Sequence, residues 1–376
     1  MIAIDATPLQ SEHRFRGVGT YTRQLVEHLA AKIPDQVTFI ATKNGMDLLP
    51  DAVRQHALTG WRGHRPAQVY WLYNEVFLRQ MLRSIKPTLF HATDFNGTVR
   101  LPRIPTVATL HDLTNIRTAA ATSGLSTRLS DWRWQVYYQR KLPHVDHLIA
   151  VSQFVKNDAV SLLNLDPDRI SVVPHGIDPS IFYPARGQGK FAHRPPYILF
   201  VGSRDPNKNL EGVLQAFALV AEQTPEIRLA IAGRWNSDDI RWLKQRVAQD
   251  SRLASRVEHL GFVANEDMAS LYSNAEVFLF LSLAEGFGFP VIEAMACGTP
   301  VVASNRGAIP EIAGDAALLV DPSEHPSMAK AIMTVLAASE VKTEYGNLGV
   351  TRAKLYQWET VADQTLAIYE TIRAHN

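Results

Sequence analysis

The sequence predicts an α/β fold built from two Rossmann-like domains. Short β-branched and apolar runs alternate with longer segments of helical periodicity through most of the chain. Such alternation is typical of βαβ units and parallel sheets. It is interrupted once and then restarts, and a length of 376 residues suits two domains.

In the first half, six strands are expected. They are Ile2–Asp5, Val37–Ala41, Leu89–His91, Val107–Leu110, His147–Val151 and Ser171–Val173. A helix is expected after Gly19, because Tyr21, Leu25 and Leu29 recur at the spacing of one helical face.

Residues 182–196 interrupt this pattern. The stretch holds Pro, Gly and Arg without hydrophobic periodicity, as a linker would. We therefore expect an N-terminal domain over 1–181, a linker over 182–196 and a C-terminal domain over 197–357. Ligands of open α/β sheets bind at the carboxyl ends of the strands, so a cleft between the two domains is the expected binding site. The second-half strands are expected at Tyr197–Val201, Arg228–Ala232, Val257–Leu260, Val277–Leu281, Pro300–Ala303 and Ala317–Val320.

The composition excludes several classes of function. The 38 Lys and Arg residues against 37 Asp and Glu give a net charge of +1, whereas a nucleic-acid binder usually carries a basic excess. The single cysteine, Cys297, can form neither a disulfide within the chain nor a cysteine metal cluster, and it is expected to be a small buried residue. We see no signal peptide and no apolar stretch long enough to span a membrane. A cytoplasmic protein is therefore expected, in contact at most with the inner face of the membrane.

Two features of the first half are candidates for a site. Gly17 and Gly19 precede the expected helix, where glycine permits close backbone approach and a helix N-terminus favours an anion. A tight turn is the other interpretation. The dinucleotide-binding pattern would need glycine at Thr22, which disfavours a dehydrogenase. His111 follows an expected strand and either faces the cleft or is a structural histidine; the adjacent Asp112 could cap a helix.

The loop after the first strand of the second domain carries two cations. Arg204 and Lys208 lie beside an expected helix N-terminus, where they could neutralise a diphosphate. A solvated surface loop is the alternative.

The most specific stretch is Glu285–Glu293. Its two carboxylates are expected to end a buried strand and to lie inside the next helix, with Pro290 in the first helical turn. Carboxylates accept hydrogen bonds from sugar hydroxyls, so two of them could bind two sugars, one being a ribose. A pair of charges matching the helix dipole is the alternative, but it leaves the glycines Gly286 and Gly288 unexplained.

The stretch Glu285–Glu293 resembles the E-x7-E motif of retaining GT-B glycosyltransferases of family GT4. Other segments agree in order along nearly the whole chain. They are the loop of Gly17 and Gly19, His111, the segment 173–178, Lys208, the segment 260–263 and the segment 296–303.

This resemblance implies roles for the matching residues. Lys208 and a nearby Arg would hold the diphosphate of a nucleotide sugar, Glu293 its ribose, and Glu285 the transferred sugar. Backbone groups around Gly286, Phe287, Gly288 and Phe289 would contact sugar and phosphate. Gly19 would let the first domain approach the donor, His111 would lie near the anomeric carbon, and Phe262 and Val263 would lie by the base.

The chain departs from the family where many relatives have an Arg. Ser203 and Asn207 occupy those positions, and Arg204 is the nearest substitute. No cofactor and no metal are expected, because Asp238 and Asp239 are adjacent and more typical of a helix start than of an Asp-x-Asp metal site.

The resemblance further implies a substrate class. The segments Ile4–Pro8 and His91–Asp94 resemble mannosyltransferases of polysaccharide assembly, so GDP-mannose is the expected donor and UDP-glucose the second candidate. The acceptor is expected to be a saccharide or a lipid-linked acceptor. A GT-B sugar-nucleotide epimerase and a non-catalytic binding protein are the competing hypotheses.

Two further expectations concern a candidate membrane-facing segment and the C-terminal tail. Residues 127–144 mix basic residues with Trp and Tyr, which suits either an anionic membrane surface or a helix packed on its own domain. The resemblance implies that a tail helix over 358–376, which includes Trp358 and Tyr369, crosses back to the first domain.

Overall fold

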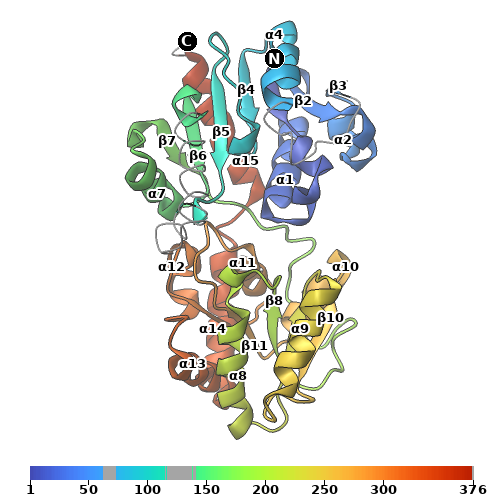
Figure 1. Cartoon of the computed structure of the whole chain (residues 1–376), viewed down its shortest axis with the longest axis vertical. Helices are drawn as coiled ribbons and strands as arrows, with labels where there is room; N and C mark the ends of the chain where they lie inside the picture. Colours follow the sequence, from blue (N-terminus) through green and yellow to red (C-terminus); the bar gives the residue numbers. More distant parts are fainter. Residues whose placement is uncertain (62–72, 115, 117–137, 139–140, 375–376) are drawn as a thin grey trace. The chain divides into compact units, whose positions relative to one another are not determined.

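The computed structural model describes residues 1–61, 73–114, 116, 138 and 141–374. The chain forms two compact units. The first comprises the described parts of Met1–Gly176 together with the segment from Trp358 onward, and the second comprises Ile177–Gln357. Each unit contains one parallel sheet with helices on both faces (Figure 1), so the predicted α/β class is confirmed.

The sheet of the first unit has the order β3-β2-β1-β4-β5-β6-β7, and all its pairs are parallel. Six of its strands match the expected ones within two residues. The strand β3 was not predicted, because its sequence ALTGW has little alternation and includes a glycine. The strands are β1 (Ile2–Asp5), β2 (Val37–Thr42), β3 (Ala57–Trp61), β4 (Leu89–Ala92), β5 (Thr106–Leu110), β6 (His147–Ala150) and β7 (Ile170–Val172).

The sheet of the second unit has the order β10-β9-β8-β11-β12-β13, again all parallel. The strand order reverses at β8, which lies between β9 and β11, and such a switch point opens a crevice at the carboxyl ends of the strands. All six expected strands are present. They are β8 (Tyr197–Val201), β9 (Arg228–Ala232), β10 (Val257–Gly261), β11 (Val277–Phe280), β12 (Val301–Ser304) and β13 (Ala317–Val320).

The helices of the second unit enclose an apolar core. Phe200, Phe217 and Leu279 are among its fully buried side chains. The strands alternate with these helices along the chain, as the hydrophobic periodicity predicts. The helices are α8 (Leu210–Gln223), α9 (Ser237–Ala248), α10 (Asn265–Ser273), α11 (Phe289–Ala296), α12 (Ile309–Ala313), α13 (His325–Ala337) and α14 (Ser339–Ala353).

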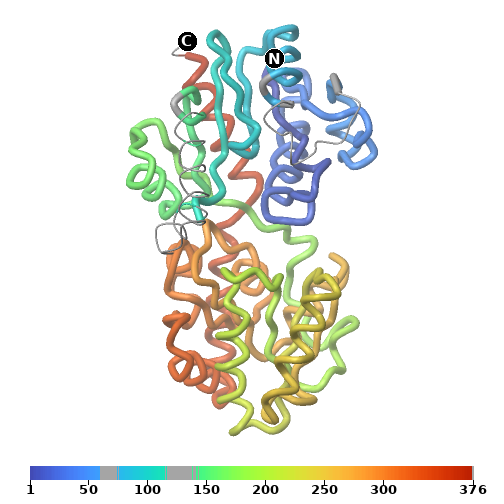
Figure 2. Tube along the Cα trace, viewed as in Figure 1, coloured from blue at the N-terminus to red at the C-terminus, as the bar shows by residue number. Residues whose placement is uncertain are grey.

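The helices of the first unit include one from the far end of the sequence. The helix α15 lies beside α1 (Figure 2), where Lys32 pairs with Glu359 and Asp363 at 3.2 and 2.8 Å. Tyr21, Leu25 and Leu29 of α1 are buried as expected. The helices are α1 (Gly17–Lys32), α2 (Asp51–Arg54), α4 (Arg79–Ile85), α7 (Gln153–Leu163) and α15 (Trp358–Ala374).

Residues 182–196, expected to be a linker, are held on the second unit. The Ser273 hydroxyl accepts a hydrogen bond from the Ala185 backbone N–H at 2.9 Å, and the Ser270 hydroxyl accepts one from Phe191 at 3.0 Å. Ala185 and Phe191 are buried. The chain passes between the units after Gly176 and again before Trp358.

Within the described ranges, no helix combines the length and apolar character needed to cross a membrane.

Candidate functional site

The loop after β8 brings Lys208 to the end of β11. Asp205 caps the short turn Pro206–Lys208 by accepting from the Asn207 N–H, and the backbone of Asn209 is left-handed with φ of 53°. The Leu283 N–H then donates to the Asn207 carbonyl at 2.8 Å. Residues 76 positions apart are thus joined at the carboxyl edge of the sheet.

Lys208 and Glu285 form an ion pair there. The Lys208 Nζ lies 2.7 Å from Glu285 Oε1, and the two side chains are only 24% and 16% exposed. The ammonium also lies 5.0 Å from the centre of the Phe280 ring. Lys208 was predicted to bind a diphosphate and Glu285 to bind a sugar, and the fold places these two side chains in direct contact.

Arg204 does not join this pair. Its guanidinium binds Asp239 at 3.1 Å and lies 4.5 Å from the centre of the Trp242 ring, both on α9. The expected role of Arg204 as the substitute diphosphate ligand stays a prediction.

The backbone of Glu285 is held by a second loop, which was not predicted. The Ala308 N–H donates to the Glu285 carbonyl at 3.0 Å. Gly307 has φ of +67°, and a Cβ there would lie 2.8 Å from both the N and the O of Glu285. Only glycine permits this approach, but nothing in the local sequence identifies the neighbour.

Gly307→Ala is therefore expected to destabilise the protein by about 3 kcal/mol and to lower any activity that depends on Glu285. Gly187→Ala is the matched control, because Gly187 has φ of +76° with nothing within 4 Å of an added Cβ. It should cost about 1–2 kcal/mol, from backbone strain alone, and leave activity unchanged. Denaturant titration and donor hydrolysis measure the two effects. Equal loss of activity in both variants would contradict this account of the Glu285 loop.

Gly288 sets the entry into α11. Its φ is +105°, and a Cβ would lie 2.5 Å from Ile309 Cδ1, so no other residue suits this position. Pro290 lies in the first turn, as predicted. Gly286 and Phe287 are buried, while the Phe287 and Phe289 rings meet edge to face with centroids 5.3 Å apart. The loop thus fixes the start of the helix that carries Glu293.

Glu293 is a partly buried carboxylate with one firm partner. The Tyr272 hydroxyl donates to its Oε2 at 2.7 Å. Burial raises the pKa of Glu293 to about 7, although the Tyr272 hydrogen bond and the Lys208 charge oppose the shift. Nothing in the local sequence identifies Tyr272, which reads as one more apolar position of α10.

The ends of β8, β9 and β10 are joined by backbone hydrogen bonds. Gly202 N–H donates to the Ala232 carbonyl, and Gly233 N–H donates to the Gly261 carbonyl, both at 2.9 Å. A Cβ at Gly233 would lie 2.2 Å from the Gly202 oxygen, so this contact requires glycine.

Phe262 and Val263 follow this joined edge. Phe262 is 62% exposed, an unusual state for a large aromatic side chain, and Val263 is half-buried. The Arg234 guanidinium lies 5.0 Å from the centre of the Phe262 ring. An exposed aromatic face at the carboxyl edge suits the stacking of a nucleotide base.

In the first unit, Gly19 packs against the backbone of His13 and Arg14. A Cβ there would lie 2.4 Å from Arg14 Cα and from the His13 oxygen. The glycine is therefore needed for packing against the segment before α1, and its expected approach to a ligand stays a prediction. Gly17 is exposed at the first position of α1. Thr22, at the position where the dinucleotide pattern needs glycine, is buried and donates to the Val18 carbonyl at 2.8 Å.

His111 is half-buried at the end of β5. Its Nε2 lies 2.9 Å from the Thr93 carbonyl, and because a carbonyl only accepts, Nε2 carries the proton and Nδ1 is the acceptor of the neutral ring. Burial lowers the pKa of His111, which favours this neutral form. The Tyr21 and His175 rings lie 5.0 and 5.5 Å away.

A buried hydrogen-bonded chain connects this cluster to α15. The Thr109 hydroxyl contacts the Tyr21 hydroxyl at 2.8 Å and His91 Nε2 at 2.9 Å, and His91 Nδ1 contacts the Tyr369 hydroxyl at 2.5 Å. Burial lowers the pKa of His91 to about 3, so His91 is neutral in this chain of hydrogen bonds near pH 7.

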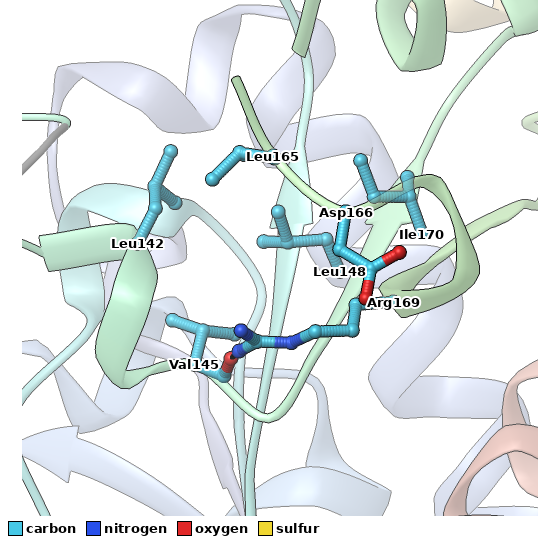
Figure 3. Close-up of a pocket in the computed structure, with 7 residues that line it drawn as sticks. All are labelled: Leu142, Val145, Leu148, Leu165, Asp166, Arg169 and Ile170. Carbon is cyan, nitrogen blue, oxygen red and sulfur yellow. Dashed lines mark hydrogen bonds between the residues drawn. The ribbon is translucent and has the colours of Figure 1, made fainter. Parts of the chain in front are cut away.

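A cavity elsewhere in the first unit offers no comparable chemistry. It measures about 10 Å³, room for about one water molecule. Arg169 crosses it and donates to the Val145 carbonyl. Figure 3 shows the lining residues, which are Leu142, Val145, Leu148, Leu165, Asp166, Arg169 and Ile170. Across the described part of the chain, no three His, Cys, Asp or Glu side chains are grouped to hold a metal.

Comparison with known families matches both halves of the chain. A family model described as "Glycosyl transferases group 1" matches residues 184–349, and one described as "Glycosyltransferase Family 4" matches residues 15–181. O-antigen chain mannosyltransferase B of Escherichia coli is 28% identical, over 95% of this chain and 96% of that protein. The MMP alpha-(1->4)-mannosyltransferase of Mycolicibacterium hassiacum is 30% identical, over 71% of this chain and 65% of that protein.

Solved structures share the fold. Sucrose-phosphate synthase from Thermosynechococcus elongatus superposes with a TM-score of 0.84 at 23% identity, covering 100% of this chain and 99% of that one. WaaG, a glycosyltransferase involved in lipopolysaccharide biosynthesis, gives 0.74 at 15% identity, over 98% and 99% of the two chains. Anabaena Alr3699/HepE in complex with UDP and glucose gives 0.72 at 19% identity, over 98% and 99%.

Proposed function

The chain belongs to the GT-B glycosyltransferases of family 4, and from this premise we propose that it transfers a hexose from a nucleotide-diphosphate sugar with retention and without a metal. The acceptor is a saccharide or a lipid-linked acceptor. The contact of Lys208 with Glu285, 2.7 Å apart at the carboxyl edge of the sheet, is the observation that carries the proposal.

Each charged group has a distinct task in this reaction. The bond between the anomeric carbon and the diphosphate oxygen breaks, and the acceptor oxygen bonds to the same face of that carbon. The acceptor proton passes to the departing diphosphate. Lys208 stabilises the charge that grows on the diphosphate, which is the main electrostatic contribution to such a reaction. Glu285 binds hydroxyls of the transferred sugar, and Glu293 binds the ribose.

For His111 of the first unit, the family resemblance implies a place near the anomeric carbon, where a neutral ring can act as a hydrogen-bond acceptor. A charged imidazolium would oppose the positive charge that develops on the sugar ring. Burial lowers the pKa of His111 and so favours the neutral ring, although the hydrogen bond from Nε2–H to the Thr93 carbonyl opposes this shift.

The donor in this proposal is GDP-mannose. Relatives named as mannosyltransferases support it, as does the resemblance of Ile4–Pro8 to such enzymes. UDP-glucose is the alternative, since the UDP complex of Alr3699/HepE shows that this fold binds uridine nucleotides.

Calorimetry should show tighter binding of GDP than of UDP, and GDP-mannose should be hydrolysed slowly in the absence of an acceptor. Tighter binding of UDP would overturn the choice of donor. Release of an epimerised sugar without any acceptor would identify an epimerase instead. Sugar products separated by chromatography distinguish hydrolysis from epimerisation.

Contact with an anionic membrane surface stays a prediction. Most of residues 127–144, on which it rests, lie outside the described residues, and of this stretch the structure shows Tyr138 as buried.

A further inference from the structure

Tyr272 is fixed firmly where it meets Glu293. It lies on the buried face of α10 with no exposed surface, and its ring meets Phe278 edge to face at 5.3 Å between centroids. Its backbone carbonyl accepts a hydrogen bond from the Thr299 hydroxyl at 2.7 Å. A side chain held at ring and backbone can present its hydroxyl in one direction only.

That hydroxyl is a donor to Glu293. Burial, together with the nearby Glu293, raises the pKa of Tyr272 well above its usual value, so the phenol keeps its proton. The bond to Oε2 is 2.7 Å long, a normal length for a hydroxyl donating to a carboxylate. Within the described residues, no side chain donates to the other oxygen, Oε1.

We propose that Tyr272 is a positioning residue for nucleotide binding: its hydroxyl holds Oε2 of Glu293 and leaves Oε1 for the ribose hydroxyls. This inference rests on the proposed function, because it takes Glu293 as the ribose ligand. Tyr272 itself contacts no substrate.

The groups around Glu293 determine how nucleotide binding should depend on pH. Three titratable groups interact electrostatically with Glu293: Lys208 from the loop after β8, Tyr272 from α10 and Cys297 at the end of α11. Burial raises the pKa of Cys297 to about 12, so the thiol stays neutral between pH 6 and 9. Glu293, with its pKa raised to about 7, should titrate in that window.

The direction of the effect follows from the hydrogen bond. A carboxylate accepts from ribose hydroxyls better than a protonated carboxyl does, so nucleotide binding should weaken as the pH falls through about 7. Removing the Tyr272 hydroxyl removes a contact that lowers the pKa of Glu293. In Tyr272→Phe, the weakening should therefore begin at higher pH, by about one to two units.

The experiment is calorimetry with GDP and with UDP from pH 6 to 9. Near pH 7, Tyr272→Phe should bind GDP about tenfold more weakly than the wild type, and it should recover affinity toward pH 9. Tyr197→Phe is the matched control: Tyr197 is also buried, but its hydroxyl donates to the Leu271 carbonyl at 2.6 Å. It should lose stability without any displacement of the pH profile.

Tyr272→Phe leaves the Glu293 carboxylate without its hydroxyl donor, which can destabilise the fold. A double variant keeps the proposal testable if Tyr272→Phe does not fold. Tyr272→Phe combined with Glu293→Gln should bind GDP as Glu293→Gln does at every pH, because Tyr272 acts only through Glu293. Superimposable pH profiles for wild type and Tyr272→Phe, or additive losses in the double variant, would overturn the positioning role alone. Wild-type protein that binds neither nucleotide would overturn the proposed function as well.

Discussion

Replacing Lys208 with alanine is expected to lower kcat by about 100- to 1000-fold, the usual cost of losing one electrostatic contact to a transition state. The diphosphate gains charge as it departs, so the contact strengthens in the transition state and its loss acts on kcat. The half-buried position of Lys208 beside Glu285 keeps the cation in place before substrate arrives. Steady-state kinetics with the true donor measure the effect.

Lys342→Ala is the control for this variant. Lys342 is also half-buried and also pairs with a glutamate, Glu276, in the same unit. Its loss should cost stability with little change in kcat. The ion pair adds a complication, since Lys208→Ala leaves Glu285 partly buried without its cation. Adding Glu285→Gln to Lys208→Ala should restore stability but not turnover. Full activity of Lys208→Ala would show that the site lies elsewhere.

The variants Glu293→Gln and Glu285→Gln should differ in which kinetic constant they change. Glu293→Gln removes a contact to the ribose, which does not change during the reaction, so KM should rise by about 10- to 100-fold with kcat less affected. Glu285→Gln removes a contact to a sugar ring that flattens in the transition state, so kcat should fall too, and the choice between sugars on one nucleotide should blur. The assay is best run at pH 8, because the pKa of Glu293 lies near 7.

Binding of the free nucleoside diphosphate decides between the two assignments. Glu211→Gln is the control, since Glu211 pairs with Arg246 on helices α8 and α9. If Glu293→Gln keeps nucleotide affinity while Glu285→Gln abolishes it, the two roles are reversed. If both variants bind nucleotide and turn over as the wild type does, neither carboxylate contacts the donor.

The sheets could be predicted because parallel strands buried on both faces are continuous apolar runs. Twelve expected strands are present, and the helical face of Tyr21, Leu25 and Leu29 is buried. The strand β3 could not be predicted, because ALTGW owes its conformation to pairing with β2 rather than to its own pattern. Residues 182–196 were expected to be a linker because their sequence lacks periodicity. A segment without periodicity can still be held on a domain by hydrogen bonds to side chains, here those of Ser270 and Ser273.

The candidate site shows the same division. Lys208, Glu285 and Glu293 could be chosen because local motifs surround them, and the fold brings the first two into contact. Tyr272 and Gly307 could not be predicted as site residues, because their importance comes from contacts with residues about twenty positions away. Arg204 was chosen as a second cation beside an expected helix N-terminus and as the nearest substitute for an Arg of relatives, and the structure places its side chain against α9.

The placement of α15 has a consequence for biosynthesis. The helix is translated only after the whole of Ile177–Gln357, yet Tyr369 reaches back 278 positions to His91. The unit that leaves the ribosome first is therefore completed last. While the second unit is being made, the nascent first unit exposes the apolar surface that α15 later covers, a state in which chains aggregate or recruit chaperones. Translation speed through the second unit thus sets how long that surface stays open.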